Sequence, residues 1–186
     1  MSILSQFKVF HRVYFSQPKS DRVLYRAVRR QRVTSILELG IGDLDKALRL
    51  ITMAGQIQAD PTRITYTGID LFDARGADLE PLHLKQAHQC LSRSGAKIKL
   101  VPGDADEGLT RTANALLDTD LVIIHRSQTS DRFSRAWFYL PRILHQGTEI
   151  FQEESVEDDG PSPAYRSISH QEIHQRAQSS VGQHVA

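Results

Sequence analysis

Five short apolar runs, separated by segments with a helical period, restrict the folds that this sequence can adopt. The fourth run, residues 121–124, is apolar at every position, as a strand buried on both faces of a sheet requires. Strands that alternate with single helices form units whose strands run mainly parallel. The sequence therefore predicts a three-layer α/β domain around a mostly parallel sheet of at least five strands. Those strands are 35–39, 64–71, 97–101, 121–124 and 148–152.

Helical patterns fill the connections between the predicted strands. They cover residues 21–32, 44–57, 80–93, 109–117 and a stripe from Phe133 to Leu144, in which Pro141 predicts a kink or an early end. Ser169 followed by Glu172 has the spacing of a capping box that opens one more short helix.

A chain of 186 residues is the size of one domain. We expect an N-terminal extension over 1–20, the α/β domain over 21–152, and an acidic linker with a short helix or tail over 153–186. Because the last segment is neither strand-rich nor strongly apolar, the sheet is expected to end early or to be completed by a partner chain. An exposed sheet edge would then be a surface for a homodimer.

The overall charge indicates no special partner. The 23 basic and 22 acidic side chains nearly cancel, so nothing in the composition points to nucleic acid or to a membrane surface. The single cysteine, Cys90, excludes an internal disulfide framework and a cysteine-based zinc cluster, and we predict no metal site. Without a signal sequence or an apolar run of about 20 residues, a cytoplasmic location is expected.

The turn after the first predicted strand contains Gly40 and Gly42. Open parallel sheets bind ligands at the carboxyl ends of their strands, and glycines there let the backbone approach a ligand closely. The free amides of the following helix N-terminus suit polar or anionic groups. The alternative is an ordinary turn that happens to contain two glycines.

Three acidic residues lie near the carboxyl ends of successive predicted strands. Glu38 comes directly before the glycines, Asp70 ends the second strand, and Asp104 follows the third. A carboxylate at Asp70 can accept hydrogen bonds from both hydroxyls of a ribose, and one at Asp104 can meet the exocyclic amine of an adenine. Each residue taken alone also suits a solvated loop or a capping role.

In these segments the chain resembles the class I S-adenosylmethionine-dependent methyltransferases, which have a Rossmann-like fold. The matching segments are ILELGIG (36–42), YTGIDL (66–71), VPGDADE (101–107) and LVIIH (121–125), within a resemblance that covers about 21–152. The resemblance implies S-adenosylmethionine as cofactor, with Glu38, Gly40 and Gly42 around its methionine part. It also implies that Asp70 binds the ribose, that Leu71 packs beside the adenine, that Asp104 and Ala105 recognise the adenine edge, and that His125 lies near the transferable methyl group.

The pattern after Gly42 departs from that family and from the dinucleotide-binding enzymes. Leu44, between Asp43 and Asp45, stands where the family usually has a third small residue. The chain also lacks the third glycine of the dinucleotide-binding fingerprint, which disfavours an NAD-dependent oxidoreductase.

The leading hypothesis is therefore an S-adenosylmethionine-dependent methyltransferase that acts on a small molecule. His125 would be the base for the methyl acceptor, with the alternative that it only completes a turn. A second hypothesis is a non-catalytic protein of the same fold that serves as a binding or partner module, and an NAD-dependent oxidoreductase is the third.

Overall fold

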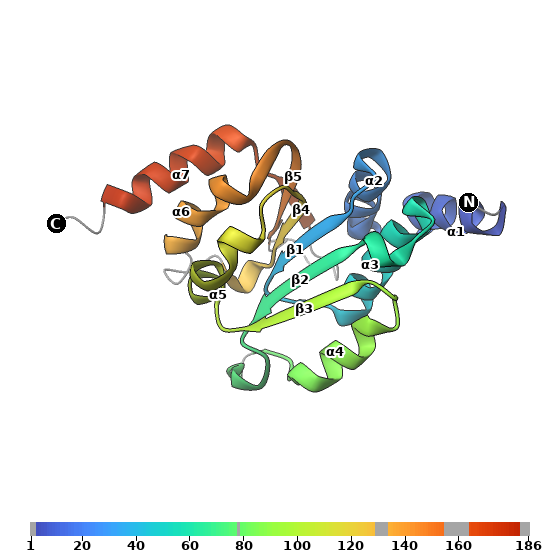
Figure 1. The fold of residues 1–186 in the computed structure, drawn as a ribbon, viewed down its shortest axis with the longest axis horizontal. Helices are drawn as coiled ribbons and strands as arrows, with labels where there is room; N and C mark the ends of the chain where they lie inside the picture. The colour runs from blue at the N-terminus through green and yellow to red at the C-terminus, as the bar shows by residue number, and fades with distance from the viewer. Residues whose placement is uncertain (1–2, 78, 129–133, 155–163, 183–186) are drawn as a thin grey trace.

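A computed structural model describes residues 3–77, 79–128, 134–154 and 164–182. One mixed sheet forms its centre, in the order β3-β2-β1-β4-β5-β6, with only β6 antiparallel to its neighbour (Figure 1). The predicted α/β architecture with a mostly parallel sheet is confirmed. The strands are β1 Ser35–Leu39, β2 Thr65–Asp70, β3 Lys97–Pro102, β4 Thr119–Ile124, β5 Leu144–Glu154 and β6 Ala164–Ser167.

Helices cover both faces of this sheet, and each face has its own apolar cluster. The first cluster joins α1, α2, α3 and α4 to one face, and the second joins α5, α6 and α7 to the other. Figure 1 shows α1 and α7 at opposite ends of the long axis. The helices are α1 Ile3–Phe15, α2 Arg22–Gln31, α3 Leu44–Gln58, α4 Leu84–Ser92, α5 Ala105–Thr112, α6 Ser134–Ile143 and α7 His170–Gly182.

The alternation of side chains along β1 decides which way its acidic residue points. Leu37 and Leu39 belong to the cluster under α5 and α6, whereas Ile36 belongs to the cluster under α3. Successive side chains of a strand point to opposite faces, so Glu38 shares the face of Ile36. Glu38 therefore faces α3, the helix that begins directly after the glycine turn.

Two predicted helices begin elsewhere. Helix α4 begins at Leu84, where the backbone amide donates to Asp73 Oδ2, rather than at about residue 80. Helix α5 begins four residues before the predicted start, because Asp104 caps it by accepting from the Glu107 amide at 2.9 Å.

The C-terminal region adds more structure than its composition predicts. Strand β6 pairs with β5, although the sequence pattern does not predict it. Helix α6 contains Pro141 and ends at Ile143, one residue before the end of the predicted stripe. The Ser169 hydroxyl accepts from the Glu172 amide at 3.1 Å, as the capping pattern predicts. Phe133 and most of the acidic segment after residue 154 lie outside the described residues.

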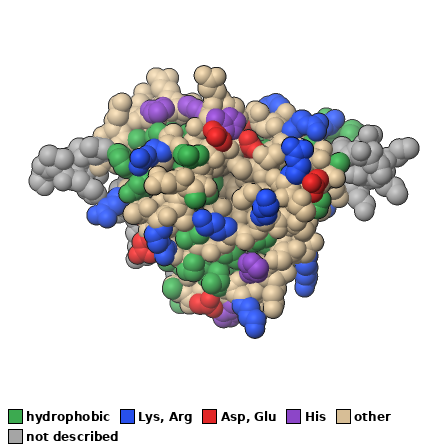
Figure 2. Space-filling view, in the orientation of Figure 1, with side chains coloured by type: hydrophobic (Ala, Val, Ile, Leu, Met, Phe, Trp, Pro, Cys, Tyr) green, Lys and Arg blue, Asp and Glu red, His purple; other side chains and the backbone are tan. Residues whose placement is uncertain are grey.

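The basic side chains of the described residues in Figure 2 do not form a single extended patch. On the face shown in Figure 2, lysine and arginine side chains lie in several separate groups among neutral atoms. Within the described residues, no helix is long and apolar enough to cross a membrane. The proposed homodimer stays a prediction, because the structure contains one chain.

Candidate active site at the carboxyl ends of the strands

The glycine turn after β1 has the backbone that only glycine adopts easily. Gly40 has a φ of +76°, and a Cβ added there would lie 2.9 Å from His125 Cβ. A Cβ at Gly42 would lie 2.6 Å from His125 Cδ2. Both glycines are therefore required for close approach, and the side chain that approaches them in this structure is His125.

Glu38 is fully buried and lies among side chains that could not be placed from the sequence. Its Oε2 accepts a hydrogen bond of 2.8 Å from Tyr66, and its Oε1 lies 3.2 Å from Lys46 Nζ, in α3. The Lys46 ammonium also donates to the Tyr165 hydroxyl of β6, at 3.0 Å. Burial is the largest single influence and lowers the pKa of Lys46, but Glu38, Tyr165 and Glu153 together outweigh it and raise the pKa above its ordinary value.

One oxygen of Glu38 is incompletely bonded. Oε1 is close to the ammonium but has no hydrogen bond of acceptable geometry, so the contact with Lys46 is an ion pair only. A buried acceptor without an aligned donor is costly. Among the buried side-chain atoms of the described residues that lack a hydrogen bond, this oxygen lies nearest to the glycine turn in sequence.

Asp70, in contrast, is surrounded by aligned donors. Oδ2 accepts from the Ile41 amide at 2.7 Å and from Arg75 Nη2 at 2.9 Å. Oδ1 accepts from the Phe72 amide at 2.9 Å and from Arg75 Nε at 2.8 Å. The carboxylate thus links the end of β2 to the glycine turn, and Arg75 holds it with a two-pronged ion pair.

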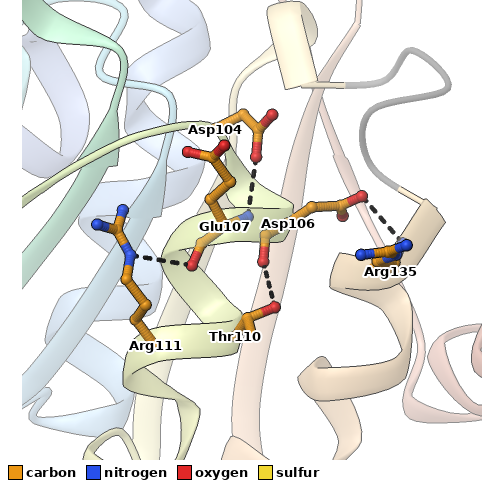
Figure 3. A pocket seen from close by; sticks show the side chains of 6 residues that line it. All are labelled: Asp104, Asp106, Glu107, Thr110, Arg111 and Arg135. Atoms are coloured by element: carbon orange, nitrogen blue, oxygen red, sulfur yellow. Dashed lines mark hydrogen bonds between the residues drawn. The ribbon is translucent and has the colours of Figure 1, made fainter.

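The two residues predicted to recognise adenine, Ala105 and Asp104, have different surroundings. The Ala105 amide donates to Gln128 Oε1 at 3.2 Å, and Gln128 also packs against Gly40, so one side chain connects these two predicted residues. Asp104 instead caps α5 and lines an open pocket of about 670 Å³ between α5 and α6 (Figure 3). The capping alternative thus describes Asp104 in this structure, while Leu71 lies half-buried after β2.

The remaining walls of that pocket are charged or polar. They are Asp106, Glu107, Thr110, Arg111 and Arg135. Asp106 accepts from the backbone amides of Arg135 and Ala136, which ties the start of α6 to α5. None of the residues that line this pocket belongs to the glycine turn after β1.

His125 follows β4 and is mostly buried. Burial, with the positive charges of Lys46 and Arg126, lowers its pKa from 6.5 to about 4, so the ring is neutral at neutral pH. The Ser127 amide donates to Nδ1 at 3.2 Å, which places the ring proton on Nε2. The Ser127 hydroxyl lies 2.7 Å from the same Nδ1, and Nε2 lies 3.2 Å from Glu153 Oε2.

The structure thus brings most predicted residues to one end of the sheet and adds residues that were not predicted. Lys46 had a weak signal, a charged residue within the apolar stripe of its helix, whereas nothing in the spacing marks Tyr66, Arg75 or Gln128. Among the residues that the structure describes, no three His, Cys, Asp or Glu side chains gather as a metal site.

Comparisons with known proteins support the fold. No protein-family profile matches the chain, and no curated protein matches its sequence. The O-methyltransferase TomG from Streptomyces achromogenes, solved with SAM, aligns over 98% of this chain and 78% of its own, with 12% identity and a TM-score of 0.50. CalS11, a TDP-rhamnose 3'-O-methyltransferase, aligns over 88% and 92%, with 15% identity and a TM-score of 0.52.

A third structure agrees with these two. Cofactor-bound Rv0187 from MTB aligns over 98% of this chain and 77% of its own, with 16% identity and a TM-score of 0.51. The chain spans 92% of the CalS11 chain but about a third of the longer MycE chain. In its sheet and flanking helices, the chain has the Rossmann-like fold of the class I S-adenosylmethionine-dependent methyltransferases.

Proposed function

We propose that this chain is an S-adenosylmethionine-dependent methyltransferase that acts on a small molecule. The observation that carries the proposal is the position of two buried carboxylates, Glu38 and Asp70, on either side of a glycine turn at the ends of neighbouring parallel strands. Ligands of open α/β sheets bind at this edge. TomG, with the same fold, was solved in complex with SAM, and CalS11 acts on a sugar nucleotide.

The side chains present fit the chemistry of this cofactor. Glu38 Oε1 is a buried acceptor without an aligned donor, which the ammonium of a methionine tail would supply. Asp70 suits a ribose diol, Leu71 would pack beside the adenine, and Asp104 and Ala105 would meet its edge. When bound, S-adenosylmethionine supplies a methyl group activated by a sulfonium.

His125 is assigned the proton that the methyl acceptor gives up. Its ring is neutral, and its lone pair is on Nδ1, which faces Ser127. A proton from the acceptor would therefore reach Nδ1 through the Ser127 hydroxyl, 2.7 Å away. Because a pKa of about 4 makes His125 a weak base, its main contribution would be to position the acceptor.

A second candidate function is the non-catalytic binding or partner module. The observation that favours it is that each carboxylate already holds a cation of the chain, Lys46 at Glu38 and Arg75 at Asp70. The two candidates differ in turnover. Methyl transfer to any acceptor in a panel of small molecules excludes the non-catalytic module, whereas saturable cofactor binding without turnover favours it.

Calorimetry with S-adenosylhomocysteine tests the proposal. We expect saturable heat with the wild type and a loss of affinity of at least about tenfold in Asp70→Asn, which loses a charged acceptor. The matched control is Asp118→Asn, an exposed position directly before β4, at the opposite end of the sheet, which should bind as the wild type does. No heat from the folded wild type would overturn the proposed function.

A further inference from the structure

Arg75 bridges the glycine turn and the end of β2. Besides its two bonds to Asp70, its guanidinium donates from Nη2 to the Ile41 carbonyl and from Nη1 to the Glu80 carbonyl at 2.7 Å. The side chain is 9% exposed. One arginine thus connects three segments at the place where the proposed function puts the ribose of the cofactor.

The carboxylate of Asp70 has no free acceptor site while Arg75 is there. An ionised carboxylate offers about four lone-pair sites. The amides of Ile41 and Phe72 take two of them, and Arg75 Nε and Nη2 take the other two. A ribose diol would have to replace the two arginine bonds, since the two amides belong to the backbone of the turn and of the strand end.

The surroundings of Arg75 allow such a replacement. Arg75 directly follows a short 3₁₀ helix, Phe72–Ala74, in the connection between β2 and α4. Its neighbours Asp73, Ala74, Gly76 and Ala77 are exposed, so this part of the connection lies at the surface and outside the apolar core. Asp70 would exchange two arginine donors for two hydroxyl donors and would remain fully hydrogen-bonded.

We propose that Arg75 is an internal occupant of the ribose position, which holds Asp70 in the ligand-free protein and is displaced when a nucleoside binds. This inference rests on the proposed function. The binding-competent state is then only a fraction of the population, and the apparent dissociation constant is weakened by that fraction. Removing the guanidinium should therefore strengthen cofactor binding, whereas an arginine that contacts the cofactor would weaken it when removed.

Three proteins test this by calorimetry with S-adenosylhomocysteine: the wild type, Arg75→Met and Arg63→Met. Methionine keeps the unbranched apolar stem without a donor. Arg63 is exposed and lies just before β2, at the other end of the strand from Asp70. We expect Arg75→Met to bind on the order of tenfold more tightly than the other two, which should not differ.

A second variant and a second measurement cover the case in which Arg75→Met fails to fold. Arg75→Lys keeps the charge but loses the two-pronged geometry, so its affinity should lie between those of Arg75→Met and the wild type. In the wild type, the ¹⁵N–¹H resonance of Arg75 Nε should shift when S-adenosylhomocysteine is added, because the bond to Asp70 Oδ1 is lost.

The outcomes separate this inference from the proposed function. Equal or weaker binding by both Arg75 variants, with saturable binding by the wild type, overturns the inference and leaves the proposed function intact. Tighter binding by Arg75→Met than by the wild type and Arg63→Met supports the inference. No heat from any of the folded proteins overturns both.

Discussion

Glu38 and Asp70 both hold a buried cation at the ends of neighbouring strands, yet the two pairs are built differently. Asp70 has four aligned donors, two of them backbone amides. Glu38 has one aligned donor, the Tyr66 hydroxyl, and an ammonium at 3.2 Å without a hydrogen bond of acceptable geometry.

The difference concerns what each carboxylate keeps when its cation leaves. Asp70 would keep two backbone donors, so its charge would stay partly compensated. Glu38 would keep a single hydroxyl, in a region that also contains Glu153. A buried charge without a partner is strongly destabilising. Stability should therefore depend more on Lys46, and ligand access should depend more on Arg75.

The largest expected effect is on the free energy of unfolding, when Lys46 and Arg75 are each replaced by methionine. Lys46→Met should lower the free energy of unfolding by about 4 kcal/mol, because it leaves Glu38 buried and unpaired. Arg75→Met should lower it by about 2 kcal/mol, because Asp70 keeps the Ile41 and Phe72 amides. Urea unfolding measures both, and a loss at Arg75 that equals or exceeds the loss at Lys46 would refute the comparison.

The next effect is a pH dependence of the stability, which comes from His125. The pKa of the His125 side chain is about 4 in the folded chain and 6.5 when the side chain is exposed in the unfolded chain. Between these two pH values the unfolded chain therefore binds more protons than the folded chain. Stability should therefore fall as pH falls from about 6.5 to 4, by up to about 3 kcal/mol from this group. The raised pKa of Glu153 acts in the opposite direction.

Comparison with His125→Gln isolates the histidine term. Its unfolding free energy should fall less steeply over the same pH range than that of the wild type, when both are followed by urea unfolding at several pH values. Parallel curves for the two proteins would mean that His125 does not titrate as its burial requires.

A smaller loss is expected from the hydroxyl that Glu38 retains. Tyr66→Phe should cost about 2 kcal/mol, because it removes the aligned donor to a fully buried carboxylate. Tyr14→Phe is the control, since Tyr14 is 44% exposed on α1. Equal unfolding midpoints for Tyr66→Phe and the control would show that the Glu38 carboxylate does not depend on this bond.

The sequence predicts the sheet well because apolar runs and helical periods are local patterns. It identifies all five parallel strands, although the helix starts at Ala105 and Leu84 depend on caps that the pattern does not show. It also places Glu38, Gly40, Gly42, Asp70 and His125 at one end of the sheet.

The partners of those residues could not be predicted in the same way. Lys46 reaches Glu38 from a helix, and Tyr165 reaches Lys46 from β6. These contacts depend on how α3 and β6 pack against the sheet. Asp104 caps α5 through Oδ1, and its role in adenine recognition stays a prediction.

A crystal structure of the wild type with S-adenosylhomocysteine tests the central claim most directly. We expect the ligand beside the Gly40 turn, its ribose hydroxyls on Asp70, and Arg75 displaced from that carboxylate. A bound ligand with Arg75 still on Asp70, or a ligand bound away from the Gly40 turn, would contradict it.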